Sequence, residues 1–158
     1  MIARGATLVG VISDTHGLLR PEALAALRGA DLIIHAGDVG KPEVIEALRA
    51  IAPTHVVRGN IDTASWAEAL PMTARVDVGK RQFFVLHEIA QLDLDPAAAG
   101  FAAVVYGHSH QPVIETRAGV LFLNPGSAGP RRFKLPIALA RVVVSERELR
   151  PEIVELSV

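Results

Sequence analysis

Seven side chains that can bind a metal ion stand in short polar segments of this sequence. They carry carboxylate, amide or imidazole groups: Asp14, His16, Asp38, Asn60, His87, His108 and His110. Of the six histidines, only His35 and His55 lie outside this set. Each residue taken alone is an ordinary turn or strand-end residue. As a set, they indicate a nitrogen and oxygen site for Mn, Fe, Co, Ni or Zn, because an oxygen-only set would instead favour Mg or Ca.

A predicted strand ends just before each of these polar groups. The runs are apolar and rich in β-branched residues, and they cover residues 7–12, 32–36, 55–58, 82–86 and 101–106. Helices that begin near Pro21 and Pro42 separate the first three strands, which predicts parallel βαβ units. Ligands of open α/β sheets bind beyond the carboxyl ends of the strands. We therefore expect the polar groups to meet at one edge.

The second half of the chain is richer in predicted strands. Residues 75–78 and 82–86 flank a Gly-Lys pair that is typical of a hairpin turn, and a short Ala-rich helix is predicted at residues 96–99. Further strands are predicted at residues 113–116, 120–123, 137–144 and 152–156. This order predicts an α/β fold, a four-layer αββα sandwich with two mixed β-sheets flanked by helices. We interpret residues 1–158 as a single domain.

The charge, hydrophobicity and cysteine content of the chain argue against several classes of protein, among them nucleic-acid-binding and membrane proteins. The formal net charge is -1, and Arg131, Arg132 and Lys134 form the only local basic cluster, so we expect neither sequence-specific nucleic-acid binding nor membrane binding. No apolar stretch approaches the roughly 18 residues of a membrane span, and no leader cleavage site is visible. The absence of cysteine excludes disulfides and thiolate ligands and agrees with a cytoplasmic location.

The ordered motifs resemble those of a known family. The series D-x-H, G-D, G-N, an isolated His and G-H-x-H resembles the calcineurin-like metallophosphoesterase superfamily. The short chain, with "GNID" and "LNPGSAGPRR", is similar to the small YfcE-type phosphodiesterase branch, to which the retromer scaffold subunit also belongs. The resemblance runs from about Leu8 to Arg132.

This resemblance implies two divalent transition-metal ions, with Mn expected and Ni, Fe, Co or Zn as alternatives. Carried over residue by residue, the resemblance assigns the first metal to Asp14, His16 and His110. It assigns the second metal to Asn60, His87 and His108. Asp38 would bridge the two metals. The resemblance also implies catalytic roles for Asp38, Asn60 and His87. Asn60 and Arg131 would bind substrate, a small phosphodiester or nucleotide-like molecule. A water or hydroxide that bridges the metals would attack phosphorus in line.

The chain departs from the family pattern at two positions. Ile61 stands where larger members have a histidine thought to assist the leaving group, so diesters with good leaving groups are expected to react most easily. Glu88 stands where a glycine is common, which makes the second metal site and the substrate preference harder to predict.

Several alternatives stay open at this level. A protein-interaction scaffold like the retromer subunit, or a nucleotide-binding regulator, could use the same fold without turnover, although all seven ligand positions are kept. Asp62 could orient neighbouring groups or cap a turn. Residues 124–127 could place backbone N–H groups or Ser127 near the site, but we favour their interpretation as a tight turn. Arg131 and Arg132 could equally be solvated surface charge. A homo-oligomer is possible.

Overall fold

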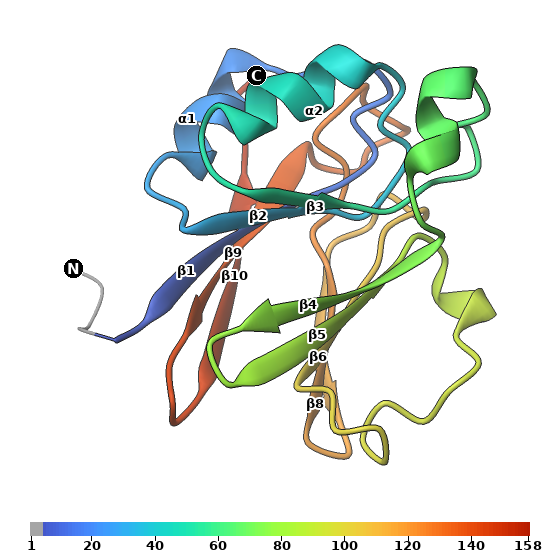
Figure 1. Ribbon diagram of the computed structural model, residues 1–158. Coiled ribbons are helices and arrows are strands. Elements are labelled where there is room, and N and C mark those ends of the chain that lie inside the picture. Colours follow the sequence, from blue (N-terminus) through green and yellow to red (C-terminus); the bar gives the residue numbers. More distant parts are fainter. Residues whose placement is uncertain (1–4) are drawn as a thin grey trace.

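The protein is described here by a computed structural model that covers residues 5–158 and contains two stacked β-sheets (Figure 1). The first four residues of the apolar N-terminal segment lie outside the described residues. The first sheet has the strand order β10-β9-β1-β2-β3. Its strands are β1 (Thr7–Ile12), β2 (Leu32–His35), β3 (Thr54–Val56), β9 (Ala138–Val144) and β10 (Leu149–Glu155).

The second sheet has the strand order β4-β5-β6-β8-β7. Its strands are β4 (Thr73–Val78), β5 (Arg81–Leu86), β6 (Ala103–Val105), β7 (Val113–Arg117) and β8 (Val120–Asn124). Both sheets are mixed. β1, β2 and β3 run parallel in the first, as do β5, β6 and β8 in the second, while antiparallel strands complete each sheet. The predicted sandwich of two mixed sheets is confirmed.

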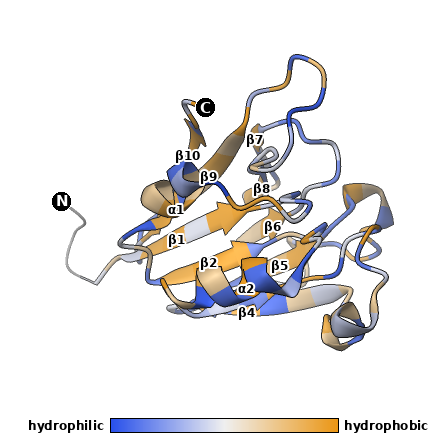
Figure 2. Cartoon of the chain, turned by 90° about the horizontal axis from the view of Figure 1, so that it is seen from above, coloured by the Kyte–Doolittle hydropathy of each residue, from blue (hydrophilic) through white to orange (hydrophobic). Residues whose placement is uncertain are grey.

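Three apolar clusters hold the layers together. The first lies between the sheets and joins residues such as Val9 and Val11 of β1 to Phe83 and Val85 of β5. Figure 2 shows β1, β2 and β9 mainly in the hydrophobic colour, as expected for strands covered on both faces. Each buried aliphatic or aromatic side chain of this kind contributes about 1.5–3 kcal/mol of transfer free energy.

Two α-helices of the described chain cover the outer face of the first sheet (Figure 1). They are α1 (Pro21–Leu27) and α2 (Pro42–Arg49), and each begins with the proline that the sequence suggested. Leu27 and Leu48 anchor them in the second apolar cluster. A 3-10 helix, η1 (Ser65–Ala69), follows β3.

The outer face of the second sheet is covered differently. Its cluster contains Phe84, Phe101 and Phe122, and the side chains of Ile89, Leu92 and Leu94 pack on it. This covering segment contains one 3-10 helix, η2 (Ile89–Gln91). The predicted Ala-rich helix at residues 96–99 is instead a hydrogen-bonded turn. Four residues are too few to offset the nucleation cost of an α-helix, so the fourth layer is thin.

Candidate metal centre

The predicted ligands converge at the edge where the parallel strands of both sheets end. Five of the seven have left-handed backbone, with φ between 48° and 72°: Asp14, His16, Asp38, His108 and His110. This conformation is uncommon outside glycine and marks functional sites, because surrounding contacts must hold it. These residues lie two to five positions beyond the strand ends, where the left-handed backbone turns the chain back so that side chains two positions apart can face one space.

Asp14 directs one carboxylate oxygen to the protein and the other into the site. Its Oδ2 accepts hydrogen bonds from Ser13 Oγ at 2.6 Å and from the backbone N–H of His108 at 3.1 Å. Its Oδ1 lies 3.4 Å from His110 Nε2 and 3.8 Å from His16 Nε2. Asp14 Oδ1 and His16 Nε2 are buried without a hydrogen-bond partner. Since buried polar atoms are rarely left unsatisfied, these atoms fit a bound cation.

Asp38 is divided in the same way. Its Oδ1 accepts the backbone N–H of Ile61 at 3.0 Å. Its Oδ2 lies 3.5 Å from His16 Nε2 and 3.3 Å from His87 Nε2. The free oxygen of Asp38 therefore lies between two imidazoles that come from different loops.

The histidine after β5 presents a defined nitrogen. Nδ1 of His87 lies 2.7 Å from the carbonyl oxygen of Ala36, which can only accept, so Nδ1 carries a proton. Nε2 of His87 then faces Asn60 Oδ1 at 3.0 Å, and Nδ1 of His108 lies 3.3 Å from the same oxygen. With the Asn60 amide rotated, its nitrogen would instead donate to both imidazoles and to Asp38. A cation between these groups would favour the orientation that turns Oδ1 inward.

The ligand atoms are close enough to share ions. Among residues 5–158, two groups have all their ligand atoms within 4.8 Å of one another: Asp14, His16 and His110, and Asp14, Asp38 and His87. Hereafter the first half of the site means Asp14, His16 and His110, and the second half means Asn60, His87 and His108. Asp38 faces both halves.

The carboxylates of the site remain ionised at neutral pH. Burial alone would raise the pKa of Asp14, but the adjacent imidazoles and the hydrogen bond from Ser13 lower it far below its ordinary value. Burial likewise opposes ionisation of Asp38, but the adjacent His87 imidazole and the backbone N–H of Ile61 lower its pKa. For His87, burial opposes the charged form, but the adjacent carboxylates of Asp38 and Asp14 outweigh it, so its pKa is raised. This concentration of negative charge suits cations.

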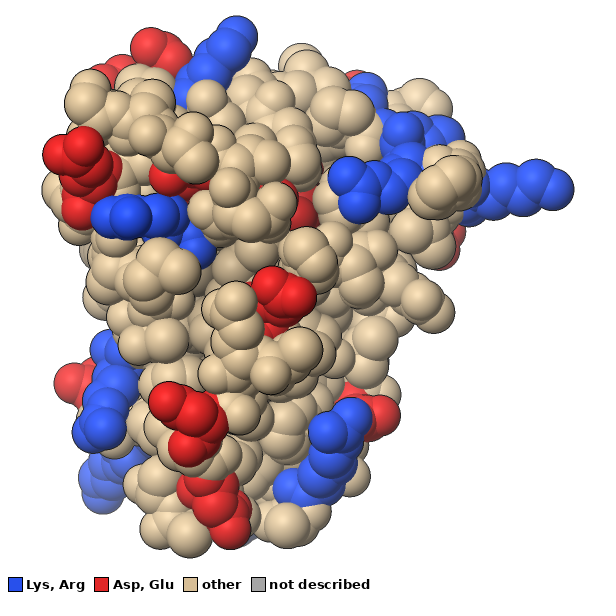
Figure 3. All heavy atoms as spheres, turned by 90° about the vertical axis from the view of Figure 1, so that its right-hand side faces the viewer, with Lys and Arg blue, Asp and Glu red and all other residues tan. Residues whose placement is uncertain are grey.

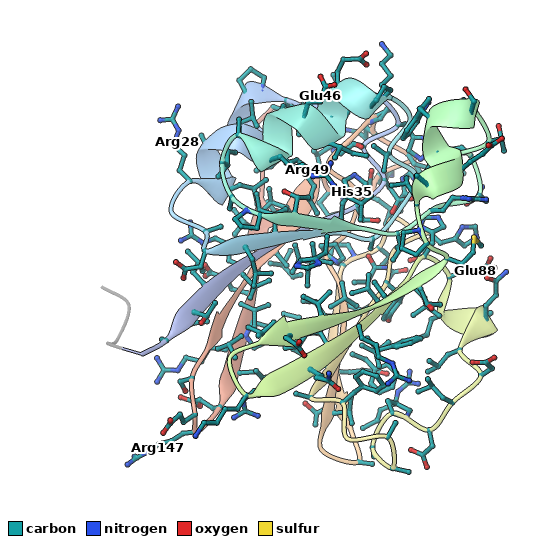
Figure 4. The ribbon with its side chains drawn as sticks, viewed as in Figure 1. Arg28, His35, Glu46, Arg49, Glu88 and Arg147 are labelled. Carbon is teal, nitrogen blue, oxygen red and sulfur yellow. The ribbon has the colours of Figure 1, made fainter. Side chains whose placement is uncertain are left out.

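A buried histidine that was left outside the predicted site connects two of its loops. His35 lies beneath α2 (Figure 4), and its Nδ1 accepts the backbone N–H of Gly37 at 3.1 Å. Its Nε2 lies 3.0 Å from Thr15 Oγ1, which itself donates to the carbonyl of Val39 at 2.9 Å. Nε2 is therefore the donor. Burial lowers the pKa of His35 to about 4, although the charges of nearby aspartates oppose the shift.

Asp62 connects the loops after β2 and β3. Its buried carboxylate accepts backbone N–H groups of Val39 at 3.1 Å, Gly40 at 3.0 Å and Gly59 at 2.9 Å. Asp62 thus holds the loop that carries Asp38 against the loop that precedes Asn60. Of the two roles considered for this residue, the contacts favour orientation of the ligand loops.

Asn124, at the end of β8, holds the loop with the paired histidines. Its Nδ2 donates to the carbonyl of Gly107 at 3.0 Å and to Ser109 Oγ at 3.1 Å, while its Oδ1 accepts the N–H of Gly126 at 2.9 Å. A Cβ on Gly107 would lie 2.6 Å from Asp14 Oδ2 and only 2.1 Å from Ser13 Oγ. Any larger residue at position 107 would separate the two ligand loops. The sequence signal for Asn124 was present in N-P-G-S, for which we favoured the role of a turn over a role at the site.

Charged side chains border the site on two sides. Glu88 lies at the surface (Figure 4), with Oε1 3.7 Å from His108 Nε2, the nitrogen that does not face Asn60. On the side of the first half, a hollow of about 140 Å³ is lined by His16, His110, Pro130, Arg131 and Arg132. His55, in β3, is exposed and takes no part in either half.

Comparisons with known proteins identify the family of this chain. The chain matches the calcineurin-like phosphoesterase superfamily domain over residues 8–147. It is 32% identical to a probable metallophosphoesterase of Methanothermobacter thermautotrophicus, covering 89% of this chain and 88% of that protein. It is 34% identical to phosphodiesterase YfcE of Escherichia coli strain K12, covering 73% and 76% of the two chains.

Solved structures share the fold. A predicted phosphoesterase from Streptococcus pneumoniae superposes with a TM-score of 0.74 at 24% identity, covering 97% of this chain and 91% of that one. Vacuolar Protein Sorting 29 of Cryptosporidium parvum gives a TM-score of 0.77 at 19% identity, covering 97% and 99%. In the described residues, no helix is both long and apolar enough to cross a membrane. The family match over residues 8–147 and the identity to the Methanothermobacter protein show that this chain belongs to the calcineurin-like phosphoesterase superfamily.

Proposed function

We propose that this protein is a phosphodiesterase that uses two divalent transition-metal ions, with manganese as the expected metal and Ni, Fe, Co or Zn as alternatives. The observation that carries the proposal is the shared pattern of Asp14 and Asp38. Each has one oxygen held by protein donors and one directed towards imidazole nitrogens. Such a set of anionic oxygens and neutral nitrogens suits borderline divalent metals.

In this proposal, the residues of the first half would hold one ion and those of the second half would hold the other. Asp38 would serve both ions, in keeping with the position of its Oδ2 between His16 and His87. Two ions in such a site lower the pKa of water and neutralise phosphate oxygens. Hydrolysis breaks one P–O bond and releases a phosphomonoester and an alcohol, with a proton passing to solvent.

The protein's own groups bind and orient the phosphodiester. If Asn60 Oδ1 served as the metal ligand, the amide nitrogen of Asn60 would be free to donate to a phosphate oxygen. Arg131, on the wall of the adjoining hollow, supplies positive charge towards the substrate. Ile61, which is 39% exposed beside Asn60, offers no proton to a leaving group. Diesters whose leaving groups depart without protonation are therefore the preferred substrates.

The test is an assay of metal-stripped protein with Mn, Ni, Co, Zn or Mg added back separately. Bis-p-nitrophenyl phosphate reports diester cleavage, p-nitrophenyl phosphate reports monoester cleavage, and Asp38→Asn is the negative control. Faster, metal-dependent cleavage of the diester that disappears in the variant would support the proposal. Two bound ions without turnover would overturn it and favour the scaffold or the nucleotide-binding regulator.

A further inference from the structure

The segment between β8 and β9 begins on the loop of Asp14. Ser127 Oγ donates to the carbonyl of Asp14 at 3.0 Å, and the N–H of Ala128 donates to Ser13 O at 3.1 Å. Gly129 packs so closely that a Cβ there would lie 2.4 Å from the carbonyl oxygen of Thr15. Residues 127–129 are therefore held in place beside the first half of the site. Residues 130–135, hereafter the arm, follow directly from them.

The arm projects from the body of the molecule. In Figure 2 the segment that leads into β9 extends beyond the edge of the sheets. Its base forms one wall of the hollow of about 140 Å³ whose other wall is His16 and His110. A group bound in this hollow would thus contact the arm and the first half of the site together.

Three cations lie within four consecutive residues of the arm. Arg131, Arg132 and Lys134 are exposed. Within residues 5–158, no carboxylate lies at ion-pair distance from any of them. The guanidinium of Arg131 donates only to the carbonyl of Leu135, at 3.4 Å. Lys and Arg side chains also gather on the upper right of the face in Figure 3. Because no carboxylate of the described chain neutralises them, these three charges are available to an anionic ligand. Arg side chains can bind a phosphate group in a bidentate manner.

An aromatic ring stands among these cations. Phe133 is 87% exposed, and its backbone has a φ of 54°. Exposure of a large ring at a left-handed position is unusual for a bulky residue. A planar base can stack on such a ring, as in proteins that bind single-stranded nucleic acids.

We infer that the arm binds the part of the substrate that does not react, and that this part is a nucleotide with a phosphate of its own. Arg131 and Arg132 contact the additional phosphate, and Phe133 stacks on the base. This inference rests on the proposed phosphodiesterase function and narrows its substrate class. An anion alone would not use the ring, and an aromatic group alone would not use the arginines.

The experiment compares three p-nitrophenyl diesters on the manganese-loaded protein. They are bis-p-nitrophenyl phosphate, the p-nitrophenyl ester of thymidine 5′-phosphate, and the same thymidine ester with an added 3′-phosphate. The expected kcat/KM of the wild type is highest for the last. The double variant Arg131→Ala/Arg132→Ala is hereafter the arm variant. In it, the ratio of kcat/KM for the thymidine ester with the 3′-phosphate to kcat/KM for the ester without it falls about tenfold or more. The change comes mainly through KM, since charge-assisted hydrogen bonds are lost. Phe133→Ala lowers kcat/KM of both thymidine esters relative to bis-p-nitrophenyl phosphate, about threefold or more.

The matched control is Arg28→Ala/Arg147→Ala, which removes the same charge from exposed positions away from the site (Figure 4). It is expected to keep the wild-type ratios. Equal ratios in the arm variant and this control would overturn the inference.

A second measurement separates this inference from the proposed function. Calorimetry measures binding of thymidine 3′,5′-bisphosphate to metal-free protein, where turnover plays no role. Weaker binding by the arm variant supports the inference even if no diester is hydrolysed. If the wild type, the arm variant and the control bind this probe alike, the inference fails even if bis-p-nitrophenyl phosphate is hydrolysed.

Discussion

The two halves of the site differ in how far the protein holds them in place. In the first half, Asp14 is completely buried, His110 is 3% exposed and the side chain of His16 is 22% exposed. In the second half, His87 is 6% exposed, but Asn60 lies at the surface and the side chain of His108 is 43% exposed. Ordering mobile ligands costs free energy, and ligands already in place avoid that cost. We therefore expect the first half to bind its ion more tightly than the second.

The largest effect is expected where the halves meet. Asp38→Asn removes the negative charge that faces both His16 and His87. Manganese-dependent hydrolysis of bis-p-nitrophenyl phosphate should fall by about 1000-fold or more, because loss of electrostatic stabilisation acts directly on the transition state. Asp93→Asn, at an exposed position, is the matched control and should keep full activity. Retention of more than a tenth of the activity by Asp38→Asn would show that the halves do not depend on this residue.

The link between the loops of Asp14 and Asp38 can be tested by pH. His35 has a pKa of about 4 when folded and an ordinary value of 6.5, so the unfolded chain binds the proton more readily. The stability from neutral His35 is fully present above pH 6.5 and is lost as the pH falls to about 4, by up to about 3 kcal/mol. The lowered pKa values of Asp14 and Asp38 change the stability only below pH 3.8, the ordinary pKa of an aspartate. The raised pKa of His87 changes the stability only above pH 6.5, where its contribution is lost as the pH rises.

The measurement is urea unfolding of metal-free protein between pH 4 and pH 7. His35→Gln cannot take up a proton and should flatten this dependence. An unchanged slope in the variant would mean that another group is responsible.

Metal titration tests the difference between the halves directly. Calorimetry of manganese binding should resolve two steps whose affinities differ by about tenfold or more. His110→Ala should remove the tighter step and His108→Ala the weaker one. A single step, or the reverse assignment, would contradict the comparison.

The hydrogen bonds of His35 sharpen the comparison further. His35→Leu removes the contacts to Gly37 and Thr15 and should weaken the tighter step about tenfold, because partners behind the ligands tune metal affinity. His35→Asn can still accept from Gly37 and His35→Gln can still donate to Thr15, so each should recover part of the loss. If His35→Leu lowers the melting temperature but binds manganese like the wild type, the residue serves stability alone.

The smallest effect is expected at the rim of the second half. Glu88 is 3.7 Å from His108 Nε2 and its side chain is 35% exposed, so solvent screens the pair. Glu88→Gln should weaken only the second manganese step, by about threefold. Glu146→Gln, at an exposed position away from the site, should leave both steps unchanged. An effect of Glu88→Gln on the first step would show that the halves are not independent.

Much of the fold could be predicted because its signals are local. Apolar runs marked the strands, and Pro21 and Pro42 marked the first residues of the helices. The segment at residues 96–99 was predicted wrongly, because its alanines favour a helix only where enough residues follow to continue it. The thin cover on the second sheet could not be predicted, since Ile89, Leu92 and Leu94 have no helical continuation but still pack on that face.

The sequence by itself determined which donor types stand at the strand ends, because residue identity and strand position are local properties. It also pointed to the family through the order of its motifs. Only the tertiary structure decided which oxygen of Asp14 and Asp38 is free. It alone revealed His35 and Asn124 as residues that hold the ligand loops. The physical reason is that these roles depend on hydrogen bonds between distant segments, such as Ser127 with Asp14 across 113 positions, which no local pattern specifies.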